Sequence, residues 1–87
     1  MPGAWNSLGV VRYQTKAPAD ACAAWERAIE LDGTQFDALY NLALVSMELG
    51  RRHAARRALE RFVADAPPER YAPDLDKARA LLRRLPA

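Results

Sequence analysis

The sequence repeats itself with a period of 34 residues. The stretch AWNSLGVVRY at 4–13 returns as ALYNLALVSM at 38–47, and identities at the same offset continue beyond both stretches. The identical pairs are Ala4 and Ala38, Leu8 and Leu42, Val11 and Val45, Ala21 and Ala55, Ala24 and Ala58, Glu26 and Glu60, and Arg27 and Arg61. Because most of these residues are small or apolar, the repeat describes a packing surface, as expected for one structural unit built twice and stacked.

Each half of the repeat contains two helical patterns. Apolar residues recur at steps of three and four, as at Ala21, Ala24, Ala28 and Leu31, which is the spacing of one helix face. Five such stripes predict helices at about 3–15, 19–31, 35–49, 52–65 and 73–85. No segment alternates apolar and polar residues over the length of a strand. The expected fold class is therefore all-α, with antiparallel helix hairpins stacked on one another.

Glycine, proline and short polar residues mark the expected helix ends. We expect Gly33 to end the second helix in the left-handed conformation, and Gly50 to close the third helix. Thr34 and Asp37 resemble a capping box at the start of the third helix. Pro73 is expected to begin the fifth helix, because proline is favoured in the first helical turn.

A helix–turn–helix unit of 34 residues resembles the tetratricopeptide repeat family. Trp5, Leu8 and Gly9 match the family's pattern in the first helix, and Ala21 with Trp25 matches the pattern in the second. The segment MELGRR resembles the family's turn between helices. The resemblance implies one domain over 1–87, with repeat one at about 2–35, repeat two at about 36–69 and a capping helix at about 73–85. It also implies a right-handed superhelical stack.

Composition points to an ordinary globular protein. The chain is 51% apolar and 28% charged, with a net charge of +2, which is too small to indicate nucleic acid by itself. It has one cysteine, no basic segment followed by an apolar stretch at its start, and no run long enough to span a membrane. We therefore expect a cytoplasmic protein without membrane association. The excess of arginine over lysine and the abundance of alanine favour a bacterial origin.

The reactive side chains do not form a catalytic or metal-binding set. Cys22 would need a base held against it, and nothing in the sequence places His53, the single histidine, beside it. One histidine and one distant cysteine are also too few for a metal site. The sequence therefore predicts a protein that is not an enzyme and that uses no cofactor or metal.

The predicted binding site is a row of residues on the first helix of each hairpin. In this architecture the first helices line the concave side of the stack, and their equivalent positions form rows. The candidate peptide-binding residues are Asn6, Val10, Tyr13, Tyr40, Asn41, Leu44 and Met47. Tyrosine and methionine offer adaptable contact area. We expect a peptide or helix of another protein to bind this face, although the same residues could instead pack against the fifth helix.

Two other functions stay open on the sequence. The chain could be a structural accessory domain of a larger bacterial protein that self-associates, as a homodimer, through the uncovered side of its first helix. Weak nucleic-acid binding could use the basic stripe of Arg51, Arg52, Arg56, Arg57 and Arg61, but acidic residues interrupt this stripe and no exposed aromatic residues accompany it. Nucleic acid is therefore the least favoured partner.

Overall fold

A computed structural model describes residue 10 and residues 17–85, and it contains four helices over the second range. They are α2 (Pro18–Leu31), α3 (Phe36–Glu48), α4 (Arg52–Asp65) and α5 (Pro68–Arg84). The all-α class is confirmed, and α2, α3 and α4 lie within one residue of the predicted bounds. The expected helix at 3–15 falls outside the described residues, apart from Val10, which is helical.

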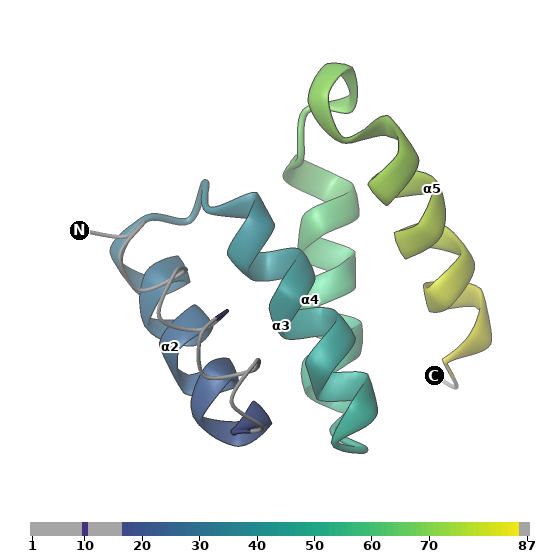
Figure 1. Ribbon diagram of the computed structural model, residues 1–87. Coiled ribbons are helices and arrows are strands. Elements are labelled where there is room, and N and C mark those ends of the chain that lie inside the picture. Colours follow the sequence, from purple (N-terminus) through teal and green to yellow (C-terminus); the bar gives the residue numbers. More distant parts are fainter. Residues whose placement is uncertain (1–9, 11–16, 86–87) are drawn as a thin grey trace.

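The helices pack in the order of the sequence. α2 contacts α3, α3 contacts α4, and α4 contacts α5, with short connections that make each neighbouring pair antiparallel (Figure 1). Within the described segment no helix combines the length and the apolar character that crossing a membrane requires.

The repeat correctly identifies the buried positions of α2 and α4. Ala21 and Ala55 are both fully buried, as are Ala28 and Phe62. Trp25 and Leu59, which the offset also aligns, are 2% and 0% exposed. The side chains at the last two pairs differ in size, so the repeat preserves which positions are buried but not which residue is buried there.

The core has two parts. The α2–α3 cluster contains Ala21, Cys22, Trp25, Ala28, Ala38, Leu42 and Val45. The aromatic cluster joins α3, α4 and α5, and four rings, those of Phe36, Tyr40, Phe62 and Tyr71, pack within it at centroid distances of 5.1–6.5 Å. Ring pairs at such distances favour edge-to-face and tilted contacts. Phe62 touches the other three rings and is the centre of this cluster.

The turn between α2 and α3 is built differently from the prediction. Gly33 does not have a positive φ, and α3 has no side-chain cap from Thr34. Instead, Oδ1 of Asp32 accepts hydrogen bonds from the backbone N–H and the hydroxyl of Thr34, at 2.9 and 2.6 Å. These bonds stabilise the carboxylate and lower the pKa of Asp32. An aspartate-centred turn therefore replaces both the left-handed glycine and the capping box.

The other predicted glycine is confirmed, and the fifth helix begins earlier than expected. Gly50 has a φ of 75°, in the left-handed region that favours glycine. α5 starts at Pro68 rather than Pro73, because Pro68 occupies the first turn, where a missing N–H costs nothing. Pro73 lies inside the helix and cannot donate to the carbonyl of Glu69. The helix is kinked two residues before this proline, where Tyr71 has non-helical backbone angles, φ −118° and ψ 20°.

Candidate functional site

The predicted binding residues that the structure describes lie on α3, together with Val10 on the preceding segment. Val10 is exposed, with 36% of its surface accessible. Tyr40, Asn41, Leu44 and Met47 are all half-buried. The remaining two candidates, Asn6 and Tyr13, fall outside the described residues. Whether the full row forms one surface therefore stays a prediction, and Val10 with the four positions on α3 is its described part.

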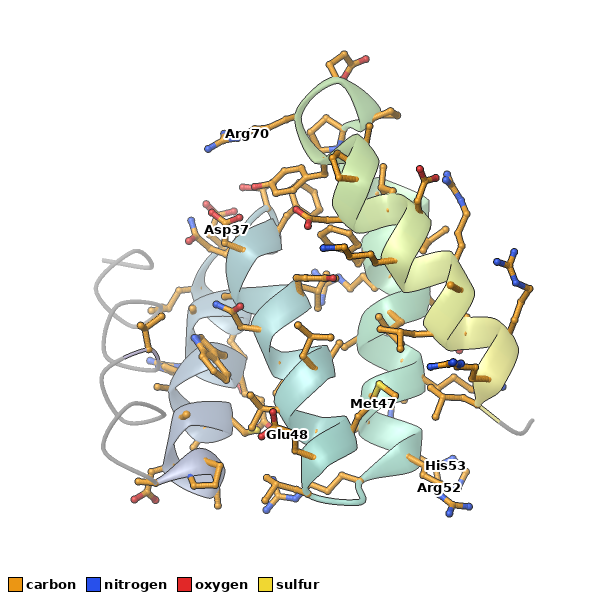
Figure 2. All side chains as sticks on the ribbon, turned by 45° about the vertical axis from the view of Figure 1, so that its right-hand side comes forward. Asp37, Met47, Glu48, Arg52, His53 and Arg70 are labelled. Carbon is orange, nitrogen blue, oxygen red and sulfur yellow. The ribbon has the colours of Figure 1, made fainter. Side chains whose placement is uncertain are left out.

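Two of these α3 residues pack toward α5. Tyr40 and Met47 both contact the aromatic cluster. The Tyr40 ring lies 5.1 Å from the Phe62 ring, and burial, followed by the nearby Asp74 charge, raises the pKa of the Tyr40 phenol. Figure 2 shows Met47 on the side of α3 that faces α4 and α5, while Glu48 points the other way. Packing against the aromatic cluster, to which α3, α4 and α5 all contribute, thus takes up part of both side chains.

The other two α3 residues have a different environment. Asn41 and Leu44 belong to neither core cluster, although they sit on a helix whose other apolar side chains are largely buried. They lie three residues apart and so share one face of α3. Asn41 provides an amide that can donate and accept, and Leu44 beside it provides apolar surface. This pair can bond the backbone of an extended peptide and contact one of its side chains.

A polar cluster at one end of this surface was not predicted. Burial, followed by the charge of Asp37 and a hydrogen bond to its carboxylate, raises the pKa of Tyr71. The Arg70 guanidinium lies 5.6 Å from the centre of the Tyr71 ring, a cation–π distance. Figure 2 places Asp37 and Arg70 at the same end of the molecule. The Asp37 contact of Tyr71, together with the Phe36 ring 5.9 Å from the Tyr71 ring, joins the start of α5 to the start of α3.

The cysteine and the histidine lie in different environments. Cys22 is fully buried in the α2–α3 cluster, where burial raises the pKa of its thiol and the neighbouring Ser46 offsets only part of this effect. His53 is exposed in the first turn of α4, where it projects beside Arg52 (Figure 2). Among residues 17–85, no three histidine, cysteine or acidic side chains gather closely enough to hold a metal ion.

Two arginines of the basic stripe have structural contacts. Arg56 donates from Nη2 to the backbone carbonyl of Leu85, at 2.7 Å, and so binds the C-terminal end of α5. Arg61 lies against Gly33: a Cβ added to this glycine would be 2.5 Å from Nη2 of Arg61. The stripe is therefore not a uniform solvated face, and part of it holds neighbouring segments in place.

Comparison with known proteins supports the family resemblance. The model of the tetratricopeptide repeat family matches residues 37–68, which contain α3 and α4. The peroxisomal targeting signal receptor of Komagataella phaffii is 38% identical over 66 residues, which are 76% of this chain and 12% of the receptor. The receptor of the same name from Yarrowia lipolytica is 36% identical over 66 residues, which are 76% of this chain and 11% of the receptor. No solved structure matches the chain significantly.

These findings bear on two of the predictions. The relatives come from yeasts and lend no support to a bacterial origin. The chain spans only about an eighth of their length, so the match concerns a small part of each receptor. The matched repeat coincides with the hairpin of α3 and α4, whose buried positions follow the 34-residue period. The hairpin of α3 and α4 therefore corresponds to one tetratricopeptide repeat.

Proposed function

We propose that this chain binds a peptide segment of another protein across the face of α3 that carries Asn41 and Leu44. We expect Asn6, Val10 and Tyr13 of the preceding segment to complete the row. The observation that carries this proposal is the placement of Asn41 and Leu44 outside both core clusters. Peptide backbones need paired donors and acceptors, and an anchoring side chain needs apolar surface.

The relatives indicate which class of peptide to test first. By their names they are receptors for a peroxisomal targeting signal, and such a signal is a segment of the protein it directs. We propose the same general role here, recognition of a short segment without catalysis. A face of two repeats is small, so we expect a Kd on the order of micromolar.

The test uses the intact chain and two probes: a fluorescein-labelled peptide carrying a peroxisomal targeting signal, and a phage library of random 12-residue peptides. We expect saturable binding of the labelled peptide or enrichment of library peptides. The variants Asn41→Ala and Leu44→Glu should weaken that binding about tenfold or more, corresponding to about 1.4 kcal/mol. Glu60→Lys, on the exposed side of α4, is the control and should bind like the unchanged chain.

Each outcome decides the proposal. Weakening by the α3 variants, with the circular dichroism of each variant unchanged, supports recognition on this face. If both probes bind Asn41→Ala and Leu44→Glu as tightly as the unchanged chain, or if neither probe binds at all, the proposal is wrong. Self-association through the first helix stays the alternative prediction, and sedimentation at increasing concentration measures it separately.

A further inference from the structure

A second surface lies between α2 and α4, away from the Asn41–Leu44 face. It is a groove of about 490 Å³, with walls from α2 and α4 and a floor that includes Leu39 and Leu42 of α3. These two leucines are on the side of α3 opposite Leu44, because a helix turns 3.6 residues per turn. The groove is therefore separate from the peptide-binding face proposed above. We call it the α2–α4 groove.

The two walls of the α2–α4 groove carry opposite charges. On the α2 wall, Glu26 and Glu30 are four residues apart and project from one face; on the α4 wall, Arg57 and Arg61 have the same spacing. All four are exposed. In the described part of the chain no ion pair crosses between the walls, and the one ion pair of these residues joins Glu30 to Arg27 within α2.

The floor of the groove is apolar. Leu39, Leu42 and Ala58 line it, and Ile29 between the two glutamates is half-buried. A groove with an apolar floor and charged walls offers an anchoring contact in its centre and orienting contacts at its edges. In protein interfaces the central apolar anchor supplies most of the affinity, and charge complementarity supplies specificity and association rate.

The position of Arg61 is defined by a neighbouring loop. Its guanidinium rests on Gly33, between α2 and α3, where any Cβ would collide with Nη2. This contact brings the Arg61 guanidinium from α4 to the loop that follows α2, so this positive charge lies next to the end of the acidic wall. A side chain at position 33 would move the guanidinium elsewhere.

We propose that the α2–α4 groove binds a segment of another protein in which a bulky apolar side chain is flanked by a basic residue on one side and an acidic residue on the other. The basic residue pairs with Glu26 and Glu30, the acidic residue pairs with Arg57 and Arg61, and the apolar side chain enters between them. A second copy of this chain fits less well, because two facing hollows would enclose a void.

The test compares peptides selected by the unchanged chain with peptides selected by variants of one wall. A phage library of random 12-residue peptides is panned against the unchanged chain, against E26K/E30K and against R57E/R61E. The unchanged chain should select peptides with mixed charges around a large apolar residue. E26K/E30K, with two basic walls, should select acidic residues on both sides, and R57E/R61E should select basic residues on both sides.

Matched controls and affinities complete the experiment. Arg52→Glu, at an exposed position on α4 outside the groove, should leave the selected pattern unchanged. A synthetic peptide from the unchanged-chain selection should bind E26K/E30K at least tenfold more weakly. Changing the basic residue of that peptide to glutamate should restore its binding to this variant.

Other results overturn the inference. It fails if all three proteins select peptides with the same charge pattern. It also fails if no enriched peptide loses affinity when the charges of one wall are reversed. It also fails if the mixed-charge peptides lose binding only in Asn41→Ala and Leu44→Glu, since they would then occupy the α3 face. Because the two surfaces respond to different variants, failure here leaves the proposed function of the α3 face intact.

Discussion

The α2–α3 cluster and the aromatic cluster bury equivalent positions of the repeat with side chains of different size. Position 28 in α2 and position 62 in α4 are equivalent in the repeat and both are fully buried, yet one is alanine and the other phenylalanine. Ala28 belongs to the α2–α3 cluster, which combines Trp25 with small and aliphatic residues, whereas Phe62 contacts three other rings between α3, α4 and α5. Small residues allow backbones to approach closely, and rings fill a wider space.

The kink in α5 places one of the rings of the aromatic cluster. Tyr71 leaves the helical conformation before Pro73, and its ring turns into the cluster around Phe62. A regular helix docks by its small residues, but this one docks partly through a ring at its irregular end. The comparison teaches that a repeat dictates burial at matched positions, while the volume at each position depends on the helix that is packed against it.

The largest effect should come from removing the central ring. Phe62→Ala deletes contacts to three rings and leaves a cavity, and we expect a loss of about 3–5 kcal/mol in the free energy of unfolding, measured with urea. Phe62→Leu is the milder companion, so that stability stays measurable if the alanine variant does not fold. A loss of less than about 1 kcal/mol in Phe62→Ala would show that the aromatic cluster does not hold α5.

The reverse substitution tests the α2–α3 cluster. Ala28→Phe inserts a ring into the α2–α3 cluster, where small residues leave no space for it, and overpacking should cost about 1–3 kcal/mol in the same urea experiment. If this variant is as stable as the unchanged chain, the α2–α3 cluster has room for a ring, and the proposed distinction between the two clusters disappears.

A smaller effect is expected where Arg56 holds the end of α5. Arg56→Ala removes the hydrogen bond to the Leu85 carbonyl, and about 1 kcal/mol of stability should be lost. Hydrogen exchange should increase most in the last turn of α5. Arg57→Ala, the adjacent exposed residue, is the matched control and should change neither quantity; equal effects in both variants would argue against a specific role of Arg56.

The smallest effect concerns the buried thiol at alkaline pH. Since burial raises the pKa of Cys22 in the folded state, the folded protein keeps this proton at pH values where the unfolded chain loses it. The contribution to stability is therefore complete below the unfolded thiol pKa of 9.0 and is lost as the pH rises from there through the folded pKa. Unfolding free energies measured from pH 7 to 10.5 should fall less steeply in Cys22→Ala, and parallel curves would refute this contribution.

Helical periodicity predicted most of the fold. The bounds of α2, α3 and α4 follow from apolar stripes that are long and regular, and the 34-residue offset identified their buried positions. The start of α5 was missed because a proline pair reads equally as a stop and as a first turn. The cap of α3 was wrong because several polar residues in a short loop can satisfy the same backbone groups, and here Asp32 does so.

The site was less predictable than the fold. Periodicity assigns Tyr40 and Met47 to one side of α3 and leaves open whether they bind a partner or pack internally. The structure packs both against the aromatic cluster. The α2–α4 groove draws its lining from three helices, and the contact between Arg61 and Gly33 joins segments that no local pattern connects. Such features depend on how helices are spaced, which a single sequence does not specify.

The absence of a side chain at residue 33 has a consequence for engineering this protein. Its backbone would accept alanine without left-handed strain, so the exchange should cost the turn little. The new methyl group would nevertheless occupy the resting place of a guanidinium that borders the groove. One carbon atom in a loop would thus reposition a positive charge on a helix while the net charge stayed the same, which offers a way to tune recognition electrostatically without altering any charged residue.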